Sequence, residues 1–119
     1  MRQSIAAAHA LLFCTPEYAG ALPGAFKNLL DWTVGGIEIN DKPAGWINVS
    51  TAPAGAAGAH AELATVLRYT GAQLIDAACV HVPVARTEIG ANGVIGDPAI
   101  RHAIVEVLHA LAEAQAPGA

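Results

Sequence analysis

The sequence predicts an α/β fold, in which helices cover both faces of a parallel β-sheet. Apolar strand-like runs alternate with helix-like segments along the chain, as in successive βαβ units. The apolar run that ends at Cys14 shows no polar alternation, which is typical of a parallel strand buried on both faces. Strands and helices alternate along the chain, so we expect right-handed crossovers within one sheet.

The first third of the chain contains a short helix, a strand and a second helix. Residues 1–8 are helix formers without an N-cap before them, and we expect them to be the end of a helix. Residues 9–15 are the first expected strand, which Pro16 ends because it has no N–H to donate. The next helix should begin near Pro23 and end at residues 35–36, whose two glycines we expect to adopt the positive φ of a C-cap.

Two further strands follow, and the first of them leads into another helix. Residues 45–50 form the second expected strand, and a loop of small residues, 51–58, leads from it into a helix closed by Gly71. The third strand lies within residues 74–84. Residues 86–97 are polar and glycine-rich, and we expect them to form an irregular connection.

The last helix has clear start signals. Asp97 is the expected N-cap, and Pro98 takes the first helical position, where its missing N–H costs nothing. One apolar stripe at helical spacing should pack on the sheet. It consists of Ile100, Ile104, Val107, Leu108 and Leu111.

Composition excludes several classes of function. The chain has 119 residues, 54% of them apolar, which is enough for the core of one domain. A net charge of −4 and only six Lys and Arg make nucleic-acid binding improbable. No apolar run is long enough to span a bilayer. Cys14 and Cys79 lie in apolar runs without metal-ligand spacing, so we expect buried thiols and a cytoplasmic protein.

The binding site is expected at one edge of the sheet. In open parallel sheets, ligands bind in the crevice outside the carboxyl ends of the strands. The loop from Thr15 to Gly24 and the loop from Ser50 to Gly58 should therefore line such a crevice. A plain alternative is that each loop is only a rigid connection between a strand and a helix.

A loop motif and a helix motif occur together after the first strand. They are Thr15-Pro16-Glu17-Tyr18-Ala19-Gly20, then Leu22-Pro23-Gly24, then Lys27-Asn28-Leu29-Leu30-Asp31-Trp32. Together they resemble the signature of the NADPH-dependent FMN reductase family, which includes quinone, chromate and azo reductases. The resemblance implies a flavodoxin-like parallel sheet with helices on both faces, truncated at the N-terminus to about three strands and four helices.

The resemblance also implies where the chain begins within the family fold. In the family, a first strand, a Ser- and Arg-containing phosphate loop, its helix and a second strand would precede the residue that corresponds to Met1. We therefore expect residues 1–119 to form a single, partial flavodoxin-like domain. The strand at residues 9–15 would then be an exposed edge with a bare apolar face.

The activity implied by the resemblance is NAD(P)H-dependent reduction through FMN, with a quinone or similar small molecule as acceptor. No side chain is expected to be catalytic and no metal is expected, because the flavin itself accepts the hydride. Ala19 stands where the family usually has Asn, so contact there would depend on the backbone. The expected cofactor-binding residues are Thr15, Pro16, Glu17, Tyr18, Ala19, Gly20, Ser50, Thr51, Gly55 and Gly58.

Other polar residues receive structural interpretations. Glu17 is expected to accept backbone N–H bonds rather than to catalyse. His60 is expected to be a partly exposed helix residue, and His81 a hydrogen-bonded residue in a strand. His102, Glu106 and His109 share one helical face, for which a solvated polar surface is a better explanation than a metal site.

Family members pair as dimers or tetramers through the helix after the Pro-Glu-Tyr loop. The resemblance thus makes Phe26, Leu30 and Trp32 candidates for a subunit interface. Two alternatives to a flavin enzyme remain. The chain could be an incompetent fragment that associates through its bare edge strand, or a module that binds a small ligand between its two loops without hydride transfer.

Overall fold

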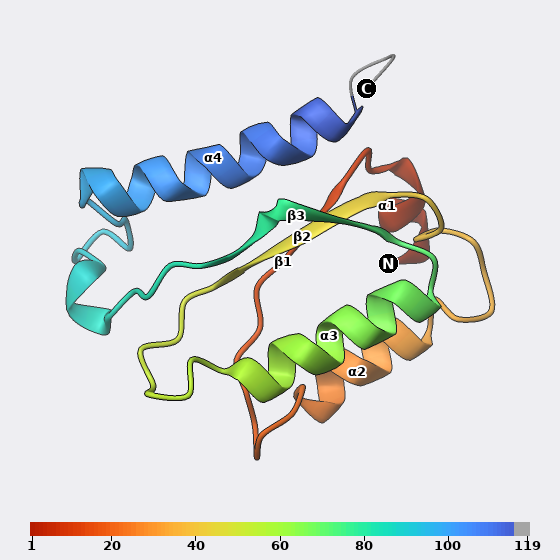
Figure 1. The fold of residues 1–119 in the computed structure, drawn as a ribbon, viewed down its shortest axis with the longest axis horizontal. Helices are drawn as coiled ribbons and strands as arrows, with labels where there is room; N and C mark the ends of the chain where they lie inside the picture. Colours follow the sequence, from red (N-terminus) through yellow and green to blue (C-terminus); the bar gives the residue numbers. More distant parts are fainter. Residues whose placement is uncertain (116–119) are drawn as a thin grey trace.

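The computed structural model describes residues 1–115, in which three parallel strands form one sheet (Figure 1). The strands are β1 (Leu11–Phe13), β2 (Pro43–Asn48) and β3 (Gln73–His81), in the order β1-β2-β3. Both neighbouring pairs are parallel. The predicted parallel sheet is confirmed.

Helices cover both faces of the sheet, as predicted. Figure 1 shows α4 on one face, and α3 with α2 on the other. A short 3₁₀ helix, η1, follows β3 in the polar connection. The helices are α1 (Arg2–Ala7), α2 (Gly24–Asp31), α3 (Ala57–Tyr69), α4 (Pro98–Gln115) and η1 (Arg86–Glu88).

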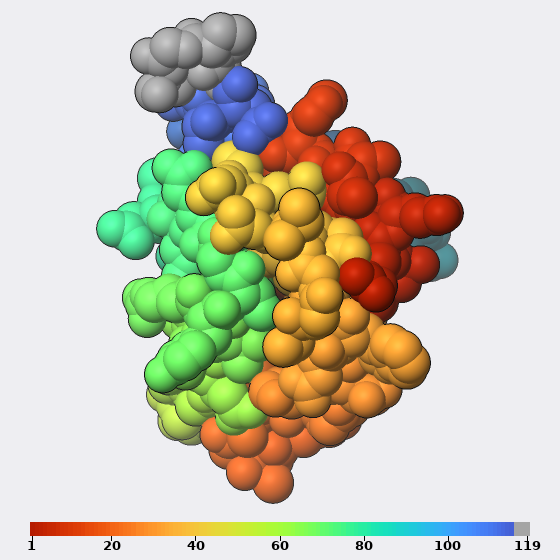
Figure 2. Space-filling model, turned by 90° about the vertical axis from the view of Figure 1, so that its right-hand side faces the viewer, coloured from red at the N-terminus to blue at the C-terminus, as the bar shows by residue number. Residues whose placement is uncertain are grey.

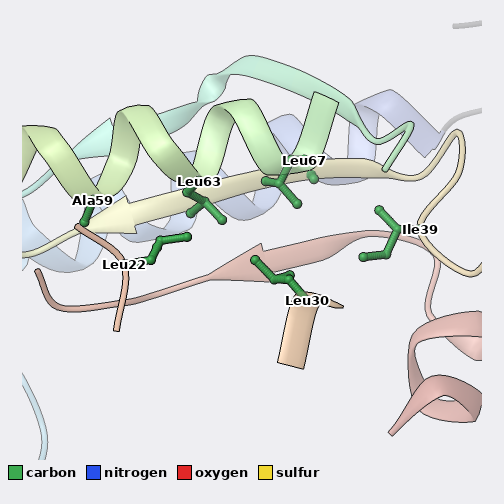
Figure 3. Packing of buried hydrophobic residues seen from close by; sticks show 7 residues of the cluster. Leu22, Leu30, Ile39, Ala59, Leu63 and Leu67 are labelled. Atoms are coloured by element: carbon green, nitrogen blue, oxygen red, sulfur yellow. The ribbon is translucent and has the colours of Figure 1, made fainter. Parts of the chain in front are cut away.

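The larger core cluster lies between the sheet and the α2/α3 layer (Figure 3). Ala59, Leu63 and Leu67 project from one face of α3, because residues four apart share a face of a helix. Half-buried Phe13 of β1 meets Phe26 of α2 edge to face, with ring centroids 5.9 Å apart. The buried members of the cluster are Leu22, Leu30, Ile39, Ala44, Ala59, Leu63 and Leu67.

Leu30 belongs to this core, so its prediction as an interface residue is wrong. Its exposed fraction is 0%, because it lies on the face of α2 that packs toward the sheet. Trp32, the other end of the predicted interface, is 65% exposed. Phe26 is half-buried against the core.

A smaller cluster joins α4 to the opposite face of the sheet. Val107 and Leu111 are buried there with Ile47 and Ala78. The predicted N-cap is confirmed, because the N–H groups of the first helical turn donate to Asp97 Oδ1 over 2.8 and 3.2 Å.

Leu108 was expected in the buried stripe of α4, and this expectation is wrong. Its exposed fraction is 48%. Leu108 lies on the side of the helix next to the sheet edge, where it lines an open groove with Leu12 of β1 and with Leu111. The described sheet has no further strand there to cover it.

The apolar run predicted a first strand buried on both faces, which is wrong, whereas the family resemblance predicted an exposed edge strand, which is confirmed. β1 has only three residues and is an edge strand of the described sheet, and Leu12 is 42% exposed. The fully embedded strand is β2, in which all residues except the half-buried Trp46 are buried. The absence of polar alternation therefore identified a parallel strand correctly but overestimated its burial, whereas the resemblance placed it correctly at the edge.

The predicted end of the second helix is also wrong. α2 ends at Asp31, and neither Gly35 nor Gly36 has a positive φ. Irregular turns carry the chain on to β2. A Cβ at Gly36 would collide with the side chains of Glu38 and Arg2, which form an ion pair 2.7 Å long. A side chain at position 36 would therefore displace this ion pair, and Gly36 does not serve as a left-handed cap.

The third helix ends as predicted. Gly71 has a φ of 85°, and its N–H donates to the Arg68 carbonyl, so it supplies the left-handed turn after α3. β3 begins two residues later at Gln73. The helix and the strand that follows it are thus joined by a minimal turn.

Figure 2 shows the face that carries the amino ends of the strands. On it, α1 (red), the α2–β2 connection (orange to yellow) and the C-terminal end of α3 (green) lie side by side. In the sequence, the residues from α2 to β2 and at the end of α3 include the exposed apolar side chains Trp32, Val34, Ile37 and Tyr69. Within residues 1–115, no helix has the length and apolar character needed to cross a membrane.

Candidate functional site

A cavity of about 560 Å³ opens at the carboxyl ends of the three strands. Each strand contributes the segment that follows it, so the walls come from three distant parts of the sequence. This is the edge at which parallel sheets place their ligands. The lining residues are Cys14, Thr15, Pro16 and Glu17 after β1, Val49, Ser50, Thr51, Ala52 and Ala56 after β2, and Val84 and Arg86 after β3.

Five of the ten predicted cofactor-binding residues line this carboxyl-end cavity. They are Thr15, Pro16, Glu17, Ser50 and Thr51. The other five lie in the same two loops but outside the lining, and they are Tyr18, Ala19, Gly20, Gly55 and Gly58. The two predicted loops therefore do meet at one site.

Tyr18, Ala19 and Gly20 form a tight turn beyond the cavity wall. Tyr18 and Ala21 exchange backbone hydrogen bonds of 2.9 and 3.1 Å. Between them, Ala19 and Gly20 both have positive φ, at 51° and 79°. Asn adopts such a φ more readily than Ala does, which gives a backbone reason for the Asn that the family usually has at this position.

Glu17 attaches the first loop to α3. Its Oε2 accepts a 3.0 Å hydrogen bond from the Ala59 N–H, in the first turn of that helix. The N-cap residue Ala56 makes no side-chain cap bond, and the first turn contains no acidic residue. The carboxylate therefore acts as a cap from a distant part of the chain, where the helix dipole also favours negative charge. The predicted structural role of Glu17 is confirmed.

Replacement of Glu17 with Ala should lower the free energy of unfolding by about 0.5–2 kcal/mol, the usual cost of a lost helix cap. Glu17→Gln keeps an oxygen that can accept the Ala59 N–H bond and should recover most of that loss. Urea unfolding of both variants measures the difference. Equal losses in the two variants would contradict the capping role.

The second loop is held by a hydrogen-bonded network at the end of β2. The Asn48 side chain donates to the Gly55 carbonyl over 2.5 Å and accepts from the Ser50 N–H over 3.1 Å. Ser50 Oγ in turn accepts from the Ala52 N–H at 3.2 Å. His81 Nε2 lies 2.8 Å from the Ser50 carbonyl, which confirms the hydrogen-bonded role predicted for this histidine. These bonds fix the floor of the cavity before any ligand enters.

The third wall of the cavity, formed by the segment after β3, was not predicted from the sequence. The β2–β3 pairing continues past both strands, because the N–H groups of Val82 and Val84 donate to the carbonyls of Asn48 and Val49 over 2.8 and 3.0 Å. This pairing carries Val84 and Arg86 to the cavity. The rule that ligands bind at carboxyl ends, applied to the third strand as well, would have found both.

The two cysteines differ, and the predicted burial of Cys14 is wrong. Cys14 is exposed at the cavity because it follows an edge strand, whereas Cys79 in β3 is half-buried. Burial raises the pKa of the Cys79 thiol, and a backbone hydrogen bond from Trp46 partly opposes this. Both cysteines are free thiols.

His60 is buried, contrary to prediction, with an exposed fraction of 6%. Its Nδ1 lies 2.9 Å from the Ala56 carbonyl, and its ring packs against Trp46 with centroids 5.6 Å apart. The sequence showed only its place in the first turn of a helix. Its burial depends on its contact with Trp46 of β2, which is distant in the sequence.

The histidines of α4 lie at the surface. His102 Nε2 is 3.6 Å from Glu106 Oε1, and both side chains are well exposed, as is His109. In the described part of the chain, no three His, Cys, Asp or Glu side chains gather as metal ligands. The arrangement agrees with the solvated polar face that the spacing indicates.

The cavity suits a planar ring with polar edges. Its volume falls in the range of roughly 300–1,000 Å³ typical of small-molecule sites. The apolar residues of the lining include Pro16, Val49 and Val84, and the hydroxyl-bearing residues include Thr51 and the buried Thr15, whose hydroxyl donates to the Pro16 carbonyl over 3.0 Å. Apolar faces with a few polar groups at the rim are what an isoalloxazine ring requires, so the residues present fit the flavin of FMN.

Comparison with known proteins gives a consistent result. Residues 1–87 match the sequence profile of the family described as NADPH-dependent FMN reductase. An NAD(P)H-dependent FMN reductase of Pseudomonas aeruginosa is 33% identical over 112 residues, which are 92% of this chain and 60% of that protein. A 2-hydroxy-1,4-benzoquinone reductase of a Burkholderia species is 35% identical over 95 residues, 77% of this chain and 52% of that protein.

Solved structures share the fold. FerB, a flavoenzyme NAD(P)H:(acceptor) oxidoreductase from Paracoccus denitrificans, superposes with a TM-score of 0.79 and 26% identity, over 96% of this chain and 65% of FerB. An oxidoreductase from Corynebacterium diphtheriae, 17% identical, superposes with a TM-score of 0.64 over 96% of this chain and 57% of that protein, and shows the fold alone. The chain thus spans about 60% and 52% of the length of the curated relatives it matches.

Proposed function

The chain belongs to the NADPH-dependent FMN reductase family, and from this premise we propose that it uses FMN to pass electrons from NAD(P)H to a quinone or similar small acceptor. The observation that carries the proposal is the cavity at the carboxyl ends, which three separate loops build from residues suited to a flat ring. The similarity to the 2-hydroxy-1,4-benzoquinone reductase of a Burkholderia species supports a quinone as acceptor.

When bound, FMN supplies the redox chemistry, because it accepts a hydride and donates two electrons. The chain's own residues bind and orient the ring. Pro16 and Val49 offer apolar surface that excludes water, and Thr15, Ser50 and Thr51 offer hydroxyl and backbone groups to the ring edge. Tyr18, Ala19 and Gly20 are proposed to contact the ring from the adjoining turn, and Gly55 and Gly58 to hold the two loops against their neighbours.

No side chain is proposed to move a proton. Glu17 is the acidic residue of the lining, and one of its carboxylate oxygens is already engaged by the Ala59 N–H. Orientation and backbone hydrogen bonds are enough for hydride transfer to a flavin. The proposed site is therefore one of positioning rather than of acid–base catalysis.

Subunit association through α2 and a cytoplasmic location are also proposed. The exposed indole of Trp32, at the end of α2, supports an interface there. Free thiols at Cys14 and Cys79 support a reducing compartment.

The edge strand β1 favours a second candidate function, which is association with another chain without flavin binding. Leu12 and Leu108 leave an open apolar groove beside β1, whose outer edge is unpaired within residues 1–115. A fragment that binds no flavin and associates through this edge would also have these features. Titration with FMN, read by visible absorbance beside the size-exclusion volume, separates the two. A perturbed, stoichiometric flavin band supports the reductase, whereas a free-flavin spectrum with concentration-dependent association supports the second candidate.

FMN should protect Cys14 from alkylation, because this thiol is exposed and lines the cavity. Without FMN, Cys14 should react with iodoacetamide faster than Cys79, whose thiol is half-buried and has a raised pKa. Saturating FMN should slow the reaction of Cys14 about tenfold or more, an effect that follows from site occupancy. Peptide mass spectrometry follows both residues, and Cys79 is the internal control. Unchanged Cys14 alkylation in FMN would place the flavin elsewhere.

A further inference from the structure

Arg86 is the cationic side chain of the cavity lining. It lies two residues beyond Val84, whose N–H donates to the Val49 carbonyl over 3.0 Å. Arg86 then begins η1, and its carbonyl accepts the Ile89 N–H at 3.1 Å. Figure 1 shows this turn in turquoise at the left, beyond the end of β3. The backbone that carries the guanidinium is thus fixed on both sides.

The charge of Arg86 is not neutralised within residues 1–115. Glu17, the acid of the same lining, gives one of its oxygens to the Ala59 N–H, and no ion pair joins it to Arg86. The Arg68 side chain likewise makes no hydrogen bond or ion pair within these residues, but it lies on α3, away from the cavity. The other four cations are engaged, in the bonds Arg2 to Glu38, Lys27 to Asp31, Lys42 to the Ala6 carbonyl and Arg101 to the Ile95 carbonyl.

The guanidinium of Arg86 has no acidic partner among the residues that the structure describes and lies in the lining of a ligand cavity, so it is suited to bind an anion. Arg remains protonated at any physiological pH and offers a planar fork that matches oxyanions in two-point hydrogen bonds. Apart from Glu17 and the Cys14 thiol, the remaining walls are apolar or hydroxyl-bearing. The flat walls suit a ring, and the guanidinium suits a negative group on a molecule bound beside that ring.

Resting on the proposed function, we infer that Arg86 binds the negatively charged group of an anionic electron acceptor, namely a quinone that carries an acidic hydroxyl. A 2-hydroxyquinone is a vinylogous carboxylic acid, so its charge lies on the reacting ring itself. The phosphates of a dinucleotide are separated from the nicotinamide by a ribose, and they would lie outside a cavity that holds the rings. In the reaction, NAD(P)H is oxidised to NAD(P)⁺. The quinone gains the two electrons and the proton of that hydride, together with one proton from solvent, and becomes the hydroquinone.

The test compares 2-hydroxy-1,4-naphthoquinone with neutral 1,4-naphthoquinone, which have the same ring size. The ratio of their kcat/KM values, anionic over neutral, should fall about ten- to one-hundred-fold in Arg86→Gln, as expected for a lost charge-assisted hydrogen bond. Arg86→Lys keeps the charge but not the fork and should lie between the two. Arg68→Gln removes the other unpartnered Arg and should leave the ratio at its wild-type value.

Two outcomes of the kinetic test would overturn the inference. One is an Arg86→Gln variant that still turns over and has the wild-type ratio of kcat/KM for the anionic over the neutral quinone. The other is a changed preference for NADPH over NADH with the quinone ratio unaffected, which would assign Arg86 to the 2′-phosphate of the donor.

A binding experiment separates this inference from the proposed function. Equilibrium dialysis of 2-hydroxy-1,4-naphthoquinone against the full chain, with and without FMN, requires no turnover. Arg86-dependent binding in a chain that reduces neither quinone would support the inference and refute the reductase. Reduction of both quinones with equal affinity in wild type and Arg86→Gln would support the reductase and refute the inference. Absence of both turnover and Arg86-dependent binding would refute both.

Discussion

Replacing Gly58 with alanine is expected to lower the free energy of unfolding by about 1–3 kcal/mol, the usual cost of an added methyl group in a closely packed site. The new Cβ would collide with the carbonyl oxygen of Gly20 and lie 3.1 Å from Glu17 Oε2. The Gly20 carbonyl is backbone and cannot rotate away. The clash therefore exceeds the gain of up to about 1 kcal/mol that alanine has over glycine inside a helix.

The same substitution should weaken FMN binding, because it pushes the first loop away from α3. That loop supplies Thr15, Pro16 and Glu17 to the cavity. Urea unfolding and an FMN titration monitored by absorbance measure the two effects. We expect a loss in FMN affinity of about tenfold or more, as for a small displacement of a positioned site.

Gly24→Ala is the matched control for Gly58→Ala. Gly24 also lies at the start of a helix, but no atom lies within 4 Å of the position of an added Cβ. This variant should be neutral or slightly stabilising, by up to about 1 kcal/mol. If Gly58→Ala unfolded at the same urea concentration as Gly24→Ala, the close approach of the first loop to α3 would be refuted.

The elements of the fold were predictable because their signals are local. Pro98 and Asp97 mark the start of α4, and Gly71 marks the end of α3, each through a backbone requirement that no distant contact alters. Strands were recognised by apolar runs between turn residues, and their parallel pairing followed from the intervening helices. The fold class depends on such signals alone.

Exposure was harder to predict than secondary structure, because exposure depends on neighbours that are distant in the sequence. Cys14, Leu12 and Leu108 are apolar in pattern, yet each lies at or beside the edge strand and is exposed. His60 shows the reverse, because a polar residue became buried when Trp46 packed against it. The sequence pattern shows which side chains are apolar. Their exposure depends on whether another part of the fold packs against them.

The candidate site shows the same division. Thr15, Ser50 and Thr51 were found because each lies at or just beyond the carboxyl end of an expected strand, and the carboxyl ends of parallel strands meet. The pairing of Glu17 with the start of α3 joins residues 42 positions apart, and no local pattern specifies that helix as the partner. Arg86 was missed because the segment after the third strand has no motif, although topology alone brings it to the cavity.

Leu30→Ala is expected to destabilise the chain by about 2–5 kcal/mol, the range for a buried leucine that leaves a cavity. Leu30, on the inner face of α2, is fully buried and packs in the core that Figure 3 shows. Because the lost contacts lie within one chain, the loss should be the same at every protein concentration. Urea unfolding at several concentrations measures it.

Trp32→Ala is the matched comparison, since Trp32 follows Leu30 by two residues but is exposed. A change at an exposed position usually alters stability by no more than about 0.5 kcal/mol. If α2 forms a subunit interface, this variant should instead weaken association, seen by sedimentation velocity, and should reduce any increase of stability with concentration. A Leu30→Ala loss that grows with protein concentration would return Leu30 to the interface, and a loss below about 1 kcal/mol would contradict its place in the core. The two variants thus separate the contribution of α2 to the stability of its own chain from its contribution to association with a second chain.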